Sequence, residues 1–98
     1  MTPREEILTA AIDIITNDRN NAYGPPTQDF QRIAGAMTAY GFRINNCIIE
    51  PHHVAMIMVL LKLSRITWSP GKQDSWLDAA GYIACGWECV RSNHKLDS

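Results

Sequence analysis

The chain has 98 residues, 46% of them hydrophobic, and nine basic and ten acidic residues give it a formal net charge of −1. This length predicts a single domain over residues 1–98, and this hydrophobic content excludes a disordered chain. The balance of charge, without any basic block, makes duplex nucleic acid an unexpected partner.

The first predicted helix covers residues 2–17. Thr2, Pro3 and Glu5 have the spacing of a capping box, in which Thr2 is the N-cap, Pro3 opens the helix and Glu5 reaches back to the N-cap. Apolar residues recur at helical spacing and predict one inward stripe, made of Ile7, Leu8, Ala11, Ile14 and Ile15. The acidic residues off this stripe are expected in solvent.

A loop over residues 18–26, rich in Asn, Gly and Pro, leads to a second predicted helix over residues 27–40. Tyr23 in this loop either stacks on a ring of a ligand or plugs the core with its hydroxyl group bonded. Thr27 is the predicted N-cap, and Asp29 in the first turn suits the positive end of the helix dipole. The predicted inward stripe is Phe30, Ile33, Ala34, Met37 and either Tyr40 or Gly41.

The third predicted helix contains residues 54–63, of which nine of ten are apolar. This run is too short for a membrane span of about 20 residues and too long for a buried strand of about 4–8. Pro51 marks its start and the breakers at 69–71 mark its end, while Asn45 and Asn46 signal the turn before it. A helix apolar on nearly every side is expected at the centre of the domain or in a subunit interface.

The fourth predicted helix covers residues 73–89. Asp74 lies in its first turn, where a carboxylate is favourable, and Asp78 follows on the same face. Gly81 in mid-helix costs about 1 kcal/mol relative to Ala, so we expect another helix or a ligand to approach closely there. The polar tail, from about residue 93 to 98, is expected to fray.

The chemistry of the protein is expected where Lys62 and Arg65, near the end of the third helix, meet Asp74 and Asp78. The two carboxylates suit Mg²⁺, which proteins commonly hold with one or two carboxylates plus phosphate oxygens. The two cations suit phosphate, with Arg65 providing a bidentate fork. The structural alternative is that Asp74 caps its helix and Asp78 forms an ion pair with Lys62 or Arg65.

A zinc site is not favoured. His52 and His53 are adjacent, and Cys85 and Cys89 are four residues apart, but neither spacing matches a known zinc motif. The two cysteines are better explained as small core residues. A Ser/His/Asp triad and a glycine-rich phosphate loop are absent from the sequence.

Taken together, five short patterns resemble a small family of phage and prophage proteins of unknown function. These patterns are R-x-x-x-Y-G-x-P at 19–26, D-F-x-x-I-A at 29–34, V-A-x-x-M at 54–58, K-x-x-R at 62–65 and D-x-x-x-D-x-A-G-Y at 74–82. The resemblance covers nearly the whole chain and implies a protein that works in the cytoplasm of a bacterial host.

More distantly, the order of helices resembles the all-α nucleotide pyrophosphohydrolases of the MazG type. In that superfamily one helix supplies E-E-x-x-E and the next E-x-x-D, and together they hold Mg²⁺ for hydrolysis of nucleoside triphosphates. Asp74 and Asp78 are similar to the second motif, with a spacing of four. Met58, Lys62 and Arg65 stand where the first motif has its glutamates.

The resemblance implies a nucleotide-processing protein, a Mg²⁺-dependent nucleoside triphosphate pyrophosphohydrolase. Asp74 and Asp78 are then the catalytic metal ligands, and the residues expected to bind substrate are Lys62, Arg65, Tyr23 and Arg19. A first alternative is a non-catalytic binder of a nucleotide, or a phage accessory protein that inhibits a host factor. A second is a structural oligomer in which all four charged residues form ion pairs.

For the architecture, we predict an all-α, single-domain protein with four helices in an antiparallel bundle. The apolar third helix predicts a homo-oligomer. The start M-T-P-R-E-E is no signal peptide, and three cysteines cannot all pair within one chain. Both observations favour a reducing cytoplasm and no membrane partner.

Overall fold

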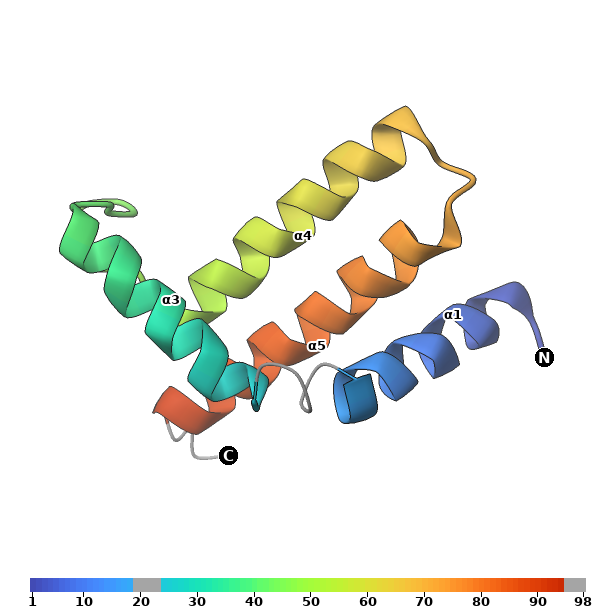
Figure 1. Ribbon diagram of the computed structural model, residues 1–98, viewed down its shortest axis with the longest axis horizontal. Helices are drawn as coiled ribbons and strands as arrows, with labels where there is room; N and C mark the ends of the chain where they lie inside the picture. Colours follow the sequence, from blue (N-terminus) through green and yellow to red (C-terminus); the bar gives the residue numbers. More distant parts are fainter. Residues whose placement is uncertain (19–23, 95–98) are drawn as a thin grey trace.

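The computed structural model of the protein describes residues 1–18 and 24–94, and this part of the chain is helical without any strand (Figure 1). The elements in chain order are α1 (Pro3–Asp13), the π-helical segment η1 (Ile14–Asp18), α3 (Pro26–Tyr40), α4 (Pro51–Trp68) and α5 (Gln73–His94). The predicted all-α class is therefore confirmed.

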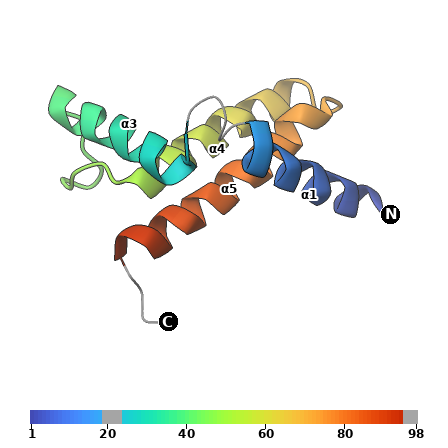
Figure 2. The ribbon, with the colours of Figure 1, turned by 60° about the horizontal axis from the view of Figure 1, so that its bottom comes forward.

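The α4–α5 pair is the centre of the molecule. The two helices run side by side in opposite directions, and α1 and α3 pack toward opposite ends of the pair (Figures 1 and 2). Within the described residues, α1 packs on α5 and on neither α3 nor α4, whereas α3 packs on both α4 and α5. A closed antiparallel bundle of four helices is thus not confirmed, and the oligomeric state stays a prediction.

The start of α1 agrees with the capping box predicted from the sequence. The Glu5 backbone N–H donates to Thr2 Oγ1 at 3.2 Å, and the Thr2 N–H donates to Glu5 Oε1 at 2.7 Å. These bonds with the Thr2 backbone and side chain hold the pKa of Glu5 below its usual value. The regular α-helix ends at Asp13, earlier than predicted, because the chain continues with the wider π-helical turns of η1.

The start of α3 differs from the prediction. Its N-cap is Pro25, which makes no side-chain cap hydrogen bond, so the prediction of Thr27 as N-cap is wrong. The ring of Pro26 fixes a helical φ angle one residue before Thr27, and Thr27 therefore already lies in the first turn. The helix ends at Gly41, whose φ of 107° is in the left-handed region that favours glycine.

The connection from α3 to α4 turns where the sequence predicts. Asn45 and Asn46 have φ angles of 50° and 64°, and their left-handed turn closes the backbone bridge between Ile44 and Cys47. The Ile49 N–H then donates to the Thr38 hydroxyl at 3.0 Å, which joins the entrance of α4 to the last turns of α3.

The boundaries of α4 agree with the Pro and Gly signals of the sequence, but the chain leaves most of this apolar helix exposed or partly exposed. It begins at Pro51 and ends at Trp68. Only Val54 and Ala55 are buried within it, so the single chain does not cover this helix on every side, and the subunit interface that was the other predicted place for its apolar surface stays a prediction. The cover is incomplete because α1 does not reach α4 and α3 covers only part of it.

The core lies where α3, α4 and α5 meet, and its buried residues are Phe30, Ala34, Ile49, Val54, Ala55, Cys85 and Cys89. The prediction that Cys85 and Cys89 are core residues is confirmed. Burial raises the pKa of the Cys89 thiol to about 11, with smaller contributions from Cys85 and Glu88.

Two glycines of α5 lie at close contacts between elements. A Cβ atom on Gly81 would lie 3.0 Å from Ile15 Cγ2, which confirms the close approach predicted at this position. A Cβ atom on Gly86 would lie 3.0 Å from the Cβ atom of Ala55 on α4. The sequence analysis did not single out Gly86, although it marks the tight crossing of the central pair.

The helix α5 extends to His94, beyond the predicted end at Cys89, and residues 95–98 of the predicted tail lie outside the described residues. In the described part of the chain, no helix has both the length and the apolar character that crossing a membrane requires.

Candidate functional site

A pocket of about 630 Å³ opens where α4 ends and α5 begins. Its walls contain all four residues that the sequence predicts to meet. The complete lining is Lys62, Ser64, Arg65, Trp68, Ser69, Lys72, Asp74, Ser75 and Asp78. The antiparallel α4–α5 pair causes this meeting, because it places the last turns of one helix beside the first turns of the next (Figure 1).

An ion pair joins the two helices across the pocket wall. Lys62 Nζ lies 2.9 Å from Asp78 Oδ2, and the two side chains are only 14% and 27% exposed. Of the two interpretations of Asp78 from the sequence, pairing with Lys62 is therefore present in the structure. A carboxylate at this depth compensates the positive charge of a largely buried lysine.

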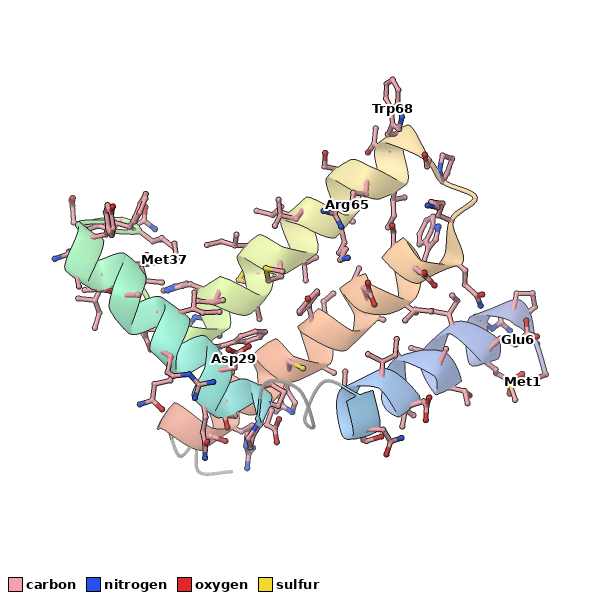
Figure 3. All side chains as sticks on the ribbon, in the orientation of Figure 1. Met1, Glu6, Asp29, Met37, Arg65 and Trp68 are labelled. Carbon is pink, nitrogen blue, oxygen red and sulfur yellow. The ribbon has the colours of Figure 1, made fainter. Side chains whose placement is uncertain are left out.

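The other charged side chains of the pocket are more exposed and can interact with a ligand. Arg65, Lys72 and Asp74 are exposed, and none of them forms an ion pair with another described residue. The pocket has three cations and two carboxylates, a formal surplus of one positive charge. Figure 3 labels Arg65 on α4, one turn before the exposed Trp68 at the end of the helix. This arrangement favours an anionic ligand over a free cation.

The loop beside the pocket is held by specific hydrogen bonds. The Ser69 N–H donates to the Arg65 carbonyl oxygen at 2.8 Å, and the Lys72 N–H donates to the Ser69 carbonyl oxygen at 3.2 Å. The indole N–H of Trp76 donates to the Pro70 carbonyl oxygen at 2.8 Å. These bonds fix the position of Lys72 relative to the two helix ends.

The N-terminal end of α5 adds to the positive potential of the pocket. A helix N-terminus presents backbone N–H groups without intrahelical partners and a partial positive charge, both of which favour anions. Asp74 and Ser75 lie in this first turn, and Ser75 is the buried polar residue among the described side chains. The carboxylate of Asp74 already uses part of this favourable potential.

Whether a magnesium ion fits the pocket depends on the ion pair between Asp78 and Lys62. Asp74 and Asp78 are the two carboxylates of the pocket, and ligation by Asp78 requires its carboxylate to leave Lys62 or to be shared with it. Among the described residues, no group of three or more His, Cys, Asp and Glu side chains has the geometry of a metal site. Substrate oxygens and waters would have to complete the coordination shell of a magnesium ion.

Of the two histidines at the start of α4, His53 has a structural role. The Glu50 backbone N–H donates to His53 Nδ1 at 2.9 Å, so His53 caps the start of the helix. The His52 and His53 rings lie 4.3 Å apart, away from the lining of the charged pocket.

Several lining residues were missed by the sequence analysis. They are the three serines of the wall, the exposed Trp68 at its rim, and Lys72. The signal for Lys72 was present, since a cation between a helix end and the next helix start lies near both once the helices pair. Arg19 and Tyr23, the other predicted substrate-binding residues, lie outside the described residues.

Comparisons with known proteins place this chain among phage sequences. The family described as Domain of unknown function (DUF6378) matches residues 6–90. The Gene 55 protein of Mycobacterium phage D29 is 35% identical over 81 residues, which cover 83% of this chain and 51% of that protein. The Gene 55 protein of Mycobacterium phage L5 is 37% identical over 76 residues, which cover 78% and 47%. The chain spans about half the length of these curated relatives. No solved structure matches it.

Proposed function

The chain belongs to the DUF6378 family, whose relatives include proteins of two mycobacteriophages, and we propose that it binds a small phosphate-bearing ligand, a nucleotide, in the charged pocket. The observation that carries this proposal is the set of cations beside the N-terminus of α5. Arg65 and Lys72 form no ion pair with a described residue, although they line the same pocket as Lys62.

Each part of the pocket suits one part of such a ligand. Arg65 can donate two parallel N–H bonds to a phosphate group, and Lys72 adds a compact point charge. The backbone N–H groups at the start of α5 can donate hydrogen bonds to the same phosphate group, and the lining serines supply hydroxyl donors. Trp68 is 89% exposed at the rim, where its indole offers a flat surface for a base. Arg19 and Tyr23 remain proposed further contacts.

Binding without catalysis is the better supported activity, because Asp78 is engaged by Lys62. The second candidate is a Mg²⁺-dependent pyrophosphohydrolase of the MazG type, with Asp74 and Asp78 holding the metal ion. Asp74 favours it, as an exposed carboxylate without an ion-pair partner among the described residues, close to the cations that would hold the phosphates. A phage accessory protein that inhibits a host factor would require no ligand in this pocket.

Titration calorimetry and thermal shift with a panel of ribo- and deoxyribonucleoside triphosphates, with and without Mg²⁺, test the proposal. A ligand at 100 times its Kd stabilises the fold by about 2.7 kcal/mol. Arg65→Ala and Lys72→Ala should each weaken binding about 10-fold or more, the effect of one lost charge-assisted hydrogen bond. Arg4→Ala removes the same charge from α1, far from the pocket in sequence, and should leave the Kd unchanged.

The outcomes separate the candidates. Metal-independent binding that the Arg65 and Lys72 variants weaken supports the binder. Release of pyrophosphate that needs Mg²⁺ and is lost in Asp74→Asn supports the hydrolase. The absence of any shift, or an equal loss of affinity in Arg4→Ala, contradicts a nucleotide site in this pocket.

A further inference from the structure

Large apolar side chains on one face of the α4–α5 pair are left exposed by the chain. They form one stripe along each helix, because residues three and four apart share a helical face. The stripe on α4 is Met56, Leu60 and Leu63, which are 61%, 63% and 47% exposed. The stripe on α5 is Trp76, Ile83 and Trp87, which are 47%, 62% and 59% exposed. We call these two stripes together the hairpin face.

A groove of about 300 Å³ joins the two stripes into one surface. Met56 lines it from α4, and Ile83 and Trp87 line it from α5. The rest of its lining is His52, Ala55, Val59, Tyr82, Gly86 and Val90. Ala55 and Gly86, which meet at the tight crossing of the two helices, lie between the two stripes in this lining.

The six side chains of the hairpin face carry no formal charge, although the Arg91 guanidinium lies over the Trp87 ring, 5.7 Å from its centroid. Residues 51–61 of α4 contain no Asp, Glu, Lys or Arg, and neither does the groove lining. Apart from Arg91 beside Trp87, an acidic or basic partner would find little that is complementary on such a surface. Two identical copies related by a two-fold axis place the same surface against itself, and the uncharged stripes can then meet without like charges between them.

The chain exposes more surface than a compact monomer of its mass. The chain exposes 6829 Å². A compact monomer of 11.0 kDa is expected to expose about 5,600 Å², which leaves an excess of about 1,200 Å². A standard stable interface buries about 800 Å² on each partner, so this excess is sufficient for one. The radius of gyration of 14.3 Å also exceeds the about 12.6 Å expected for a compact domain of this length.

We propose that the hairpin face binds a second copy of this chain, and that the protein is a symmetric homodimer through it. Met56, Leu60 and Ile83 of each copy become buried in the interface, and the side chains of one copy fill the groove of the other. This face is distinct from the charged pocket, which shares no lining residue with the groove.

Light scattering coupled to size-exclusion chromatography, over about 1 to 100 µM protein, tests the proposal in the range where a micromolar Kd is visible. The chain should elute with twice the mass of 11.0 kDa. Leu60→Glu and Ile83→Glu should each raise the dimer Kd about 30-fold or more, the effect of losing an interface hot spot. Both side chains are exposed in the single chain, so their replacement should not unfold it.

Leu8→Glu is the matched control, since Leu8 of α1, although predicted on the inward stripe of its helix, is 58% exposed and lies outside the hairpin face. Its mass should remain that of the dimer, and circular dichroism should show equal helicity in all variants. A parent chain that stays monomeric at the highest concentration overturns the proposal. A dimer that survives both hairpin-face variants, or is lost with Leu8→Glu, also overturns it.

Discussion

The Lys62–Asp78 ion pair should contribute to the stability of the fold, and replacing Asp78 tests this contribution. Asp78→Asn keeps the shape of the side chain but leaves the largely buried Lys62 without compensation. We expect the free energy of unfolding to fall by about 1–3 kcal/mol, less than for a fully buried pair. For a domain of this size, each kcal/mol lowers the Tm by about 4–8 °C, which thermal and urea unfolding measure.

Asp74→Asn is the control for this experiment. Asp74 is exposed and has no ion pair with a described residue, so its replacement should cost only its favourable interaction with the helix N-terminus, about 0.3–1 kcal/mol. A Tm that rises in Asp78→Asn would indicate repulsion between carboxylates. Such a rise, with Mg²⁺-dependent turnover in the parent protein, would favour the metal-ligand interpretation of Asp78.

The three thiols should differ sharply in reactivity. Cys47 is exposed, whereas Cys85 and Cys89 are buried and burial raises the pKa of Cys89 to about 11. At about pH 8, we expect a chromogenic disulfide reagent to modify Cys47 rapidly and the other two only as the chain unfolds. Three thiols that react equally fast in the folded protein would contradict this core.

The raised pKa of Cys89 also predicts a loss of stability in alkali. The folded state keeps its proton at pH values where the unfolded thiol, with its ordinary pKa of 9.0, has lost it. The stabilisation from this group is complete below about pH 9 and is lost as the pH rises toward about 11. Urea unfolding across this range, with Cys89→Ala as the comparison, measures the difference in slope.

At the scale of the elements, Gly86 determines how closely α4 and α5 approach. In Gly86→Ala the new methyl group would lie 3.0 Å from the Cβ atom of Ala55, which is fixed to the backbone of α4. The helices must move apart, and we expect the free energy of unfolding to fall by about 1–3 kcal/mol, despite the higher helix propensity of alanine.

Gly35→Ala is the matched control on α3. Nothing lies within 4 Å of the position its Cβ atom would take, so only propensity acts. We expect the free energy of unfolding, measured with urea, to rise by about 0.5–1 kcal/mol in this variant. For Gly81→Ala, the change in the free energy of unfolding should lie between those of Gly86→Ala and Gly35→Ala, because Ile15 Cγ2 is a side-chain atom that can shift slightly. Stabilisation by Gly86→Ala would contradict the tight crossing.

Local signals predicted the elements well, because each depends on a few neighbouring residues. The Thr2 capping box, Pro51 and the Asn45-Asn46 turn act within four residues of themselves, and all three are present in the structure. Thr27 was assigned wrongly because a competing local signal, Pro26, opens the helix first. The exposure of α4 was not predictable, since it depends on which helices reach it.

The candidate site was predictable in part for the same reason. Lys62 and Asp78 lie near the facing ends of two consecutive helices, so their meeting follows from antiparallel pairing alone. Trp68 and Lys72 belong to the site through the path of the loop, which the sequence does not specify. Which anion the pocket selects depends on the exact spacing of these groups.

Dimerisation through the hairpin face should make the thermal stability of the whole protein depend on its concentration. If folding and association are coupled, mass action raises the Tm as the protein concentration increases. We expect scanning calorimetry to show this rise for the parent chain and a much smaller one for Ile83→Glu. A Tm of the parent chain that is independent of concentration would contradict the coupling.

The three tryptophans of the chain lie at three different places in the fold. Trp68 lies at the rim of the charged pocket, Trp76 is anchored to the loop through Pro70, and Trp87 lines the apolar groove. Each indole is therefore an intrinsic fluorophore in a separate environment. In variants that keep one tryptophan and replace the others with phenylalanine, quenching at Trp68 would report ligand binding, and a blue shift at Trp87 would report association. The two events can thus be followed separately by emission, without an attached dye.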